Sequence, residues 1–306
     1  MVVNTPLNSA QNIEEMGETL SDLSDFQARS ERRWLKSLKT NKFAMTAGIV
    51  VILLVLMAIF APWIAPEDPK FIDPSIRLLE PAPGHRFGTD EFGRDVLSRV
   101  IYGARVSLLI GATVTLFAAV IGSILGLASG YYPRFDTPIM RLMDGMMAFP
   151  SILLAIAIMA SLGPSVRNVF IALTVVYVPT IARLVRGSTL VLKQQPFVES
   201  ARSIGMRDHA ILARYVFPNA LSPLIVQCTF VLAFAIISEA SLSFLGAGVP
   251  PDEPSWGNML RDGQKLIQRS WWMAIFPGIF LVITVLSFNI LGDGLRDALD
   301  PRARER

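Results

Sequence analysis

Charged residues are spaced very unevenly along this 306-residue chain, and the long uncharged stretches between them limit the folds that it can adopt. Six such stretches lie at residues 43–62, 105–134, 144–167, 167–183, 221–245 and 269–293, the fifth interrupted only by Glu239. A helix needs about 20 mostly apolar residues to cross the hydrocarbon core of a membrane. Five stretches reach that length easily, and the fourth needs its flanking residues. The chain is therefore predicted to be an all-α, polytopic membrane protein with six transmembrane helices, because only helices satisfy their own backbone in lipid.

The overall composition agrees with this prediction and excludes several other classes of protein. Hydrophobic residues make up 52% of the chain, mean hydropathy is +0.47, and charged residues make up 17%, compared with about 25% in soluble domains. These values exclude a disordered chain, a disulfide scaffold and an ordinary cytosolic enzyme, and the lack of period-2 alternation excludes a membrane barrel. The net charge of +3 is attributed to basic loops, since no nucleic-acid-binding pattern occurs. The single cysteine, Cys228, can form no internal disulfide.

The distribution of basic residues predicts how the helices are oriented. With a cytoplasmic N-terminus, 18 of the 28 Lys and Arg residues lie in inside segments and 9 in outside segments, with Arg105 at a boundary. Both termini are therefore expected in the cytoplasm. The first 28 residues contain no Lys or Arg, so they are interpreted as a tail and not as a signal peptide. The expected organisation is a tail at 1–42, a six-span domain at 43–292 with periplasmic loops at 63–104 and 246–272 and a cytoplasmic loop at 183–220, and a second tail at 293–306.

Two features around the second span concern helix packing. Gly122, Gly126 and Gly130 are spaced four residues apart, which predicts a small face on which another helix packs closely. Residues 96–102 carry apolar side chains at helical spacing. Two interpretations of them stay open: a separate interfacial helix, or the first turns of span two.

The cytoplasmic loop at 183–220 is longer than a connection between two spans needs. A helix is expected at 197–204, ending at Gly205, because glycine favours the left-handed conformation that closes a helix. A second helix is expected at 208–216 with Asp208 as its N-cap, running to Pro218. The helix face is small at Ser200 and Ala201 and can enter a groove on another protein, so docking on a cytoplasmic partner is expected. The alternative is a re-entrant or surface helix without a partner.

The same loop carries a recognisable motif. Glu199, Ala201, Gly205 and Pro218 match, at the correct spacing, the pattern E-A-A-x3-G-x9-I-x-L-P. The replacements within it are Ser200, Tyr215 and Phe217. The segment resembles the EAA loop of ABC-importer permeases, the inner-membrane subunits of ATP-driven uptake systems.

The resemblance extends over residues 40–302. The segments concerned are FGTDEFGRDVLSRVIYGARVSL, MRLMDGMMAFPSILLAI, SEASLSFLGAG, PSWGNML and LGDGLRDALDP. They are similar to the second permease subunit of peptide and nickel importers, and RLVRGSTLVLKQQPFVESARSIG is most similar to the glutathione-importer permease. The resemblance implies the type I permease fold and a substrate that is a dipeptide, an oligopeptide, glutathione or, as an alternative, nickel.

This family resemblance also implies partners and residue roles. A homologous permease subunit would complete the pathway as a heterodimer, two cytoplasmic ATPase subunits would bind ATP and Mg, and a periplasmic binding protein would deliver the cargo. Glu199 and Arg202 would make polar contacts with the ATPase, and Ser200 replaces the first alanine of the motif in the same coupling segment. Ala201 would permit close approach and Gly205 would form the turn.

Motifs for catalysis or metal binding are missing from the sequence. No G-x-x-x-x-G-K-[ST] run and no H-E-x-x-H run occurs, so this chain is not expected to hydrolyse ATP or to hold a catalytic zinc. The two histidines, His85 and His209, fall in loops on opposite sides of the predicted membrane and cannot share a metal ion. The chain is therefore expected to be a transport subunit and not an enzyme, with no catalytic, cofactor or metal site of its own.

Two acidic residues fall close to predicted spans, where charges are costly and often functional. Asp144 lies early in span three and Glu239 late in span five. Contacts that hold helices or loops together are the preferred interpretation, and a proton relay in an autonomous secondary transporter is the alternative. The segment LSFLGAG after Glu239 contains Gly246, and a gating role for this stretch is a further hypothesis, because interrupted helices often line transport pathways.

Overall fold

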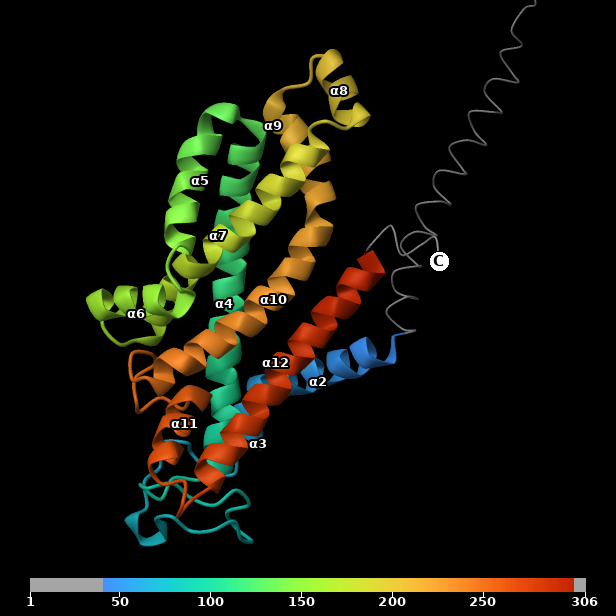
Figure 1. Cartoon of the computed structure of the whole chain (residues 1–306). Helices are drawn as coiled ribbons and strands as arrows, with labels where there is room; N and C mark the ends of the chain where they lie inside the picture. The colour runs from blue at the N-terminus through green and yellow to red at the C-terminus, as the bar shows by residue number, and fades with distance from the viewer. Residues whose placement is uncertain (1–40, 300–306) are drawn as a thin grey trace, which may run out of the picture.

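The computed structural model describes residues 41–299, so most of the expected tail at 1–42 and the last seven residues lie outside the described range. The described chain consists of helices and loops, with two isolated β-bridges. The helices in chain order are α2 (Lys42–Ile59), α3 (Ala61–Ile64), α4 (Val96–Tyr131), α5 (Pro133–Met147), α6 (Ser151–Leu162), α7 (Val166–Leu192), α8 (Pro196–Ser203), α9 (Asp208–Ile211), α10 (Phe217–Phe244), α11 (Trp256–Lys265) and α12 (Trp272–Leu299). Figure 1 shows an elongated bundle with α8 and α9 at one end, here named the α8 end, and residues 65–95 with α11 at the other, the loop end.

Five helical segments are long and apolar enough to cross a membrane, namely α2, α4, α7, the run Asp208–Phe244 and α12. They carry exposed large apolar side chains, including Leu53, Leu116 and Val282, as expected of surfaces that face lipid. The prediction of an all-α polytopic membrane protein is confirmed. A sixth span is present only if the bent pair α5 and α6 is counted as one.

The third span, expected at 144–167, is formed by a bent pair of helices and not by a single helix. Helix α6 has 12 residues, a length of about 18 Å, and cannot cross a hydrocarbon core of about 30 Å. It follows α5 at an angle of 93°. Pro150 lies between the two helices, where it lacks an N–H to donate and disfavours a helical conformation at Phe149.

Helix α7 is much longer than the marginal fourth span that the charge pattern predicts. It has 27 residues, and Arg183 and Arg186 lie within it. The Arg186 guanidinium donates to both carboxylate oxygens of Asp136 in α5, one bond measuring 2.7 Å. Arg183 Nη2 donates to Asp144 Oδ1 at 2.6 Å. The stretch at 183–192 is therefore helix, and the irregular connection begins only after Leu192.

Helices α4 and α7 pack against each other along the predicted glycine face, which is confirmed. A Cβ atom added to Gly122 would lie 2.6 Å from Ile181 Cβ, and one added to Gly126 would lie 2.6 Å from the carbonyl oxygen of Ala182. Gly130 has the same close approach to α7 one turn further along. Side chains any larger than hydrogen would separate the two helices.

Helix α4 has 36 residues and starts directly after Asp95, whose carboxylate accepts from the Ser98 N–H at 2.8 Å. Residues 96–102 are therefore the first turns of span two, and the interpretation as a separate interfacial helix is wrong.

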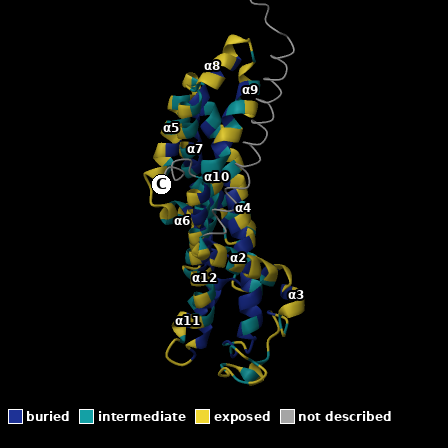
Figure 2. Cartoon of the chain, turned by 90° about the vertical axis from the view of Figure 1, so that its right-hand side faces the viewer, coloured by how far each residue is buried: buried dark blue, intermediate teal, exposed yellow. Residues whose placement is uncertain are grey.

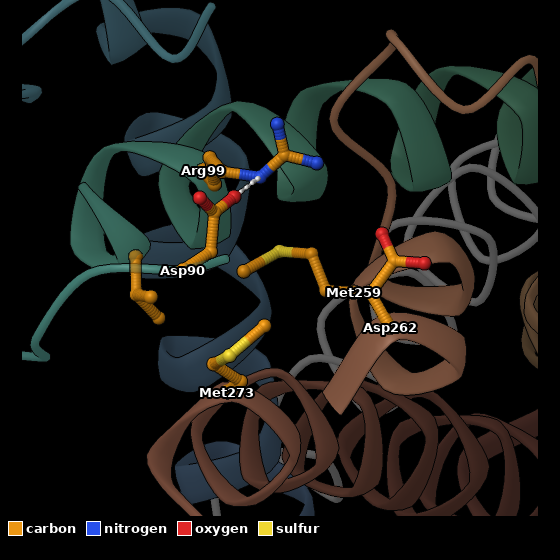
Figure 3. Close-up of a pocket in the computed structure, with 6 residues that line it drawn as sticks. Asp90, Arg99, Met259, Asp262 and Met273 are labelled. Atoms are coloured by element: carbon orange, nitrogen blue, oxygen red, sulfur yellow. Dashed lines mark ion pairs between the residues drawn. The ribbon is translucent and has the colours of Figure 1, made fainter. Parts of the chain in front are cut away.

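At the loop end, buried charges hold the long first loop together and join it to α4. Arg94 Nε donates to Asp90 Oδ2 at 2.6 Å, and Arg99 Nε lies 3.6 Å from the same oxygen. Figure 3 shows Asp90 and Arg99 facing Met259 of α11 and Met273 of α12. The loop is thus a folded part of the bundle, although its prolines disfavour helix.

Candidate functional site

Helix α8 carries the predicted motif and protrudes from the bundle at the α8 end (Figure 1). It spans Pro196–Ser203, within one residue of the expected bounds, and its first residue is a proline, which fits the first turn of a helix. Gly205 has φ +81°, a conformation that glycine adopts without steric cost. The Gly205 N–H donates to Arg202 O at 3.0 Å and the Met206 N–H to Ala201 O at 3.1 Å, which closes the helix.

The motif residues divide between two faces of α8. Glu199 and Ser200 are exposed, whereas Ala201 is 4% exposed and Val198 is fully buried. Figure 2 shows α8 as one of the most exposed elements of the chain. The buried face packs on a cluster that includes Ile211 and the end of α4. The small side chain of Ala201 therefore permits close packing within this chain, and the surface open to another protein is formed by Glu199 and its exposed neighbours.

A tyrosine that sequence reasoning missed connects α8 to the rest of the bundle. Tyr131, the last residue of α4, donates its hydroxyl to Asp208 Oδ1 at 2.8 Å and accepts from Arg202 Nη2 at 3.2 Å. The Arg202 guanidinium also lies 5.8 Å from the centre of the Tyr131 ring, within the range of a cation–π contact. The hydrogen bond with Tyr131 raises the pKa of Arg202. In the sequence, the only signal for Tyr131 is its position at the end of an apolar span, where amphipathic aromatic residues are common.

The segment after α8 differs from the expected single helix at 208–216. Arg207, and not Asp208, occupies the N-cap position, and Asp208 instead binds Tyr131. A π-helical turn at Leu212–Val216 follows and leads directly into α10. Pro218 lies in the first turn of α10, where it lacks an N–H for the preceding turn. The Asn219 side chain donates to Tyr215 O at 2.6 Å, so the widened turn is stabilised locally.

The two acidic residues near the spans lie in very different surroundings. The Asp144 side chain is 62% exposed and pairs with Arg183 between α5 and α7. Glu239 is fully buried in α10, where it accepts from the hydroxyls of Ser107 in α4 and Ser243, each at 2.9 Å. Both acidic residues therefore make the helix-to-helix contacts that were the preferred interpretation of their positions.

Gly246 ends α10 in the left-handed region, with φ +81°. Its N–H donates to Ser243 O at 3.0 Å and the next N–H donates to Leu242 O at 2.9 Å. A Cβ atom on Gly246 would meet the Arg261 guanidinium at 3.2 Å. The residue is thus a helix stop facing α11, and its gating role stays a prediction.

The two histidines lie at opposite ends of the bundle. His85 Nδ1 is 3.2 Å from Asp95 Oδ1 at the loop end, whereas His209 lies in α9. Among residues 41–299, no group of three or more His, Cys, Asp or Glu side chains is placed to hold a metal ion.

Comparison with known proteins identifies the family. Residues 118–305 match the family described as binding-protein-dependent transport system inner membrane component, and residues 32–81 match the N-terminal transmembrane domain of oligopeptide transport permease C. The chain is 45% identical over 274 residues to a dipeptide transport system permease of Alkalihalophilus pseudofirmus, covering 89% of this chain and 90% of that protein. It is 48% identical over 268 residues to a glutathione transport system permease of Escherichia coli strain 536, covering 87% and 88%.

The fold agrees with a solved ABC importer. A chain of the inward-facing MetNI methionine ABC transporter superimposes with a TM-score of 0.54 and 19% identity, covering 66% of this chain and 96% of that one. These matches favour a transport subunit over both an enzyme and an autonomous secondary transporter. The chain therefore has the type I permease fold and belongs to the family of binding-protein-dependent inner-membrane components, within the multi-pass ABC-importer permeases that include peptide permeases.

Proposed function

We propose that this chain is one of two homologous permease subunits that together form the pathway of an ATP-driven peptide importer. Its cargo would be a dipeptide, an oligopeptide or glutathione. The support is the identity of 45–48% over nearly the whole chain to permeases of dipeptide and glutathione systems. The excess of Lys and Arg in the inside segments supports an orientation with both termini and the α8 end in the cytoplasm.

The observation that carries this proposal is the geometry of α8. Helix α8 protrudes from the bundle at the end predicted to be cytoplasmic (Figure 1), and its residues Glu199 and Ser200 are exposed. Helix α8 is fastened to α4 through the hydrogen bond of Arg202 with Tyr131, and the chain continues from it through α9 and the π-helical turn into α10. A cytoplasmic ATPase that binds α8 would therefore act on two membrane helices at once. ATP and Mg would bind the two ATPase subunits, and this chain would hold neither.

The opposite end would receive the cargo. Residues 65–95 and α11 form a folded loop end at the far side of the bundle from α8 (Figure 1). Its buried ion pairs, such as Arg94 with Asp90, keep this surface in a fixed shape. A fixed surface suits repeated docking of a periplasmic binding protein, which would release peptide to the pathway.

The coupling role is tested with the complete complex in proteoliposomes. Glu199→Lys reverses a charge on the exposed face, and Gly205→Val forces a β-branched residue into φ +81°, which costs about 1–2 kcal/mol. Both variants are expected to reach the membrane, to lose co-purification of the ATPase subunits, and to lose ATP-driven peptide uptake. Glu80→Lys, an equal charge change on an exposed residue of the first loop, is the control and keeps its ATPase subunits. Normal uptake by both α8 variants would refute coupling through α8.

A further inference from the structure

A hollow of about 470 Å³ lies where the broken span meets α7 and α10. Its wall includes Met147, Phe149 and Pro150 at the break between α5 and α6, together with Tyr177 and Thr180 of α7 and Gln227 of α10. The helices that enclose it can be followed in Figure 1. The hollow lies among elements that come from three separate parts of the sequence.

The break exposes irregular backbone in this hollow. Ala148 and Pro150 are exposed and Phe149 is 62% exposed, and α6 has no side-chain hydrogen bond at its N-cap. Within a membrane, non-helical backbone is tolerated only where it is buried in protein or lines a water-filled cavity. Phe149 and Pro150 line the hollow and are exposed in this chain, so the break opens onto it.

A second hollow, of about 630 Å³, continues along the same helices toward the α8 end. Its wall includes Leu184 of α7, Asn219, Ser222 and Phe230 of α10, and Arg296 of α12. Gln227 lines both hollows. The α10 positions 219, 222, 223, 226, 227, 230, 231 and 234 that line them recur every three or four residues, so they form one face of the helix. The two hollows share Gln227 on this face of α10, and together they are named the path.

Gln227 lies deep in the span, and its side chain has no hydrogen-bond partner among the described residues of this chain. It is ten residues into α10, which corresponds to about 15 Å along the axis. Neither its amide nor the Thr180 hydroxyl makes a hydrogen bond with any residue between 41 and 299 whose contacts are described. An amide facing lipid without a partner costs several kcal/mol. Its free donors and acceptor are therefore available to water or to a solute inside the path.

We propose that Gln227, assisted by Thr180, binds the backbone of the peptide cargo as it crosses the membrane. The glutamine side chain has two N–H donors and one carbonyl acceptor, which match the C=O and N–H that every peptide group presents. Contacts of this kind ignore side-chain identity, so they suit a path through which different peptides pass. The inference rests on the proposed peptide transport and assigns this chain a contact site for that cargo.

The test uses single cysteines in the complete complex, reconstituted in proteoliposomes. Cys228, the only cysteine, is first changed to alanine. Gln227→Cys and Thr180→Cys then place a thiol in the path, and Ile225→Cys, at a 47% exposed position on α10 that lines neither hollow, is the control at the same depth. A charged, water-soluble methanethiosulfonate reagent is expected to label positions 227 and 180 about tenfold faster than 225, because only an ionised thiol in water reacts.

Peptide protection and uptake complete the test. Saturating dipeptide, added with the binding protein and ATP, is expected to slow labelling at positions 227 and 180 but not at 225. In a separate measurement, Gln227→Leu is expected to lower the uptake rate about tenfold, which corresponds to the loss of one or two hydrogen bonds. Equal labelling at 225 and 227, labelling that peptide leaves unchanged, or normal uptake by Gln227→Leu would each overturn the inference. A parent complex without ATP-dependent peptide uptake would instead refute the proposed function.

Discussion

Removal of the buried carboxylate of Glu239 measures how strongly α10 is fastened to α4. Glu239→Ala deprives the Ser107 hydroxyl of its partner, at about 1–3 kcal/mol for a buried group that is left unsatisfied. The loss of a hydrogen bond costs less at Ser243, because its hydroxyl oxygen still accepts from the Val249 N–H at 3.0 Å. The missing side chain also leaves a cavity at a fully buried site. Together we expect a loss of about 3–6 kcal/mol in the free energy of unfolding.

Glu239→Gln separates packing from proton transfer. The amide keeps the shape of the side chain, with one oxygen to accept from Ser243 and an N–H that can donate to the Ser107 oxygen. Glu239→Gln should lower the free energy of unfolding by less than about 1.5 kcal/mol. The measurements are thermal unfolding of the purified chain and ATP-driven uptake by the complete complex. We expect Glu239→Gln to transport and Glu239→Ala to unfold early. A folded Glu239→Gln complex without uptake would indicate that the carboxyl carries a proton, and a Glu239→Ala chain as stable as the parent would refute the packing argument.

Two further pairs of variants test the packing around α7, both by thermal unfolding of the purified chain. The Gly126→Ala chain should be less stable than the Gly187→Ala chain by about 1–3 kcal/mol in the free energy of unfolding. The added methyl group meets the α7 backbone at 2.6 Å at Gly126 and nothing within 4 Å at Gly187. Equal stabilities would show that α4 and α7 are not in contact at this site. Asp136→Asn should cost about 1–3 kcal/mol of stability, because it breaks a two-bond ion pair with Arg186 that is less than a third exposed. Asp144→Asn should cost less than about 1 kcal/mol, because the Asp144 side chain is 62% exposed. The reverse order would contradict the role given to the pair of Asp136 and Arg186.

The charge pattern predicts a span well where the helix has a long uncharged interior, even if charges such as Arg99 or Arg296 lie near one of its ends. It locates α2, α4, α10 and α12 because their interiors contain few charges. It fails at α7, where Arg183 and Arg186 lie inside the helix and are paired with carboxylates of α5. Those partners are 39 and 50 residues away in the sequence. No local pattern indicates that an arginine is neutralised by a distant helix, so the end of the span is placed too early.

The broken third span shows a different limit of sequence reasoning. Hydropathy sums over a window and contains no information on direction, so two short helices at 93° look like one straight span. Pro150 is visible in the sequence, but prolines also lie within α7, α10 and α12 without a break. Whether a proline bends or ends a helix depends on which neighbours satisfy the freed carbonyl, and this requires the structure.

The sequence predicts where α8 begins and ends, but it does not predict which of its residues face the rest of the bundle. The bounds of α8 follow from local signals, a proline at its start and Gly205 at its end. The inward orientation of Ala201 depends on packing against the end of α4. Tyr131 lies 71 residues before Arg202 in the sequence, so the contact between them has no local signature.

These contacts define which helices can move separately. The glycine face leaves no space between α4 and α7, so the two helices move together or separate entirely, because close-packed surfaces resist sliding. Tyr131 ties α8 to this pair, and the ion pair of Arg186 with Asp136 adds α5. At the break at 148–150 the chain bends by 93°, so that α6 points away from the direction of α5. If an ATPase binds α8 as proposed, the force would act on α4, α5 and α7 as one body and would reach α10 through the π-helical turn. The path that contains Gln227 is bounded by α7 and α10, so its width would change.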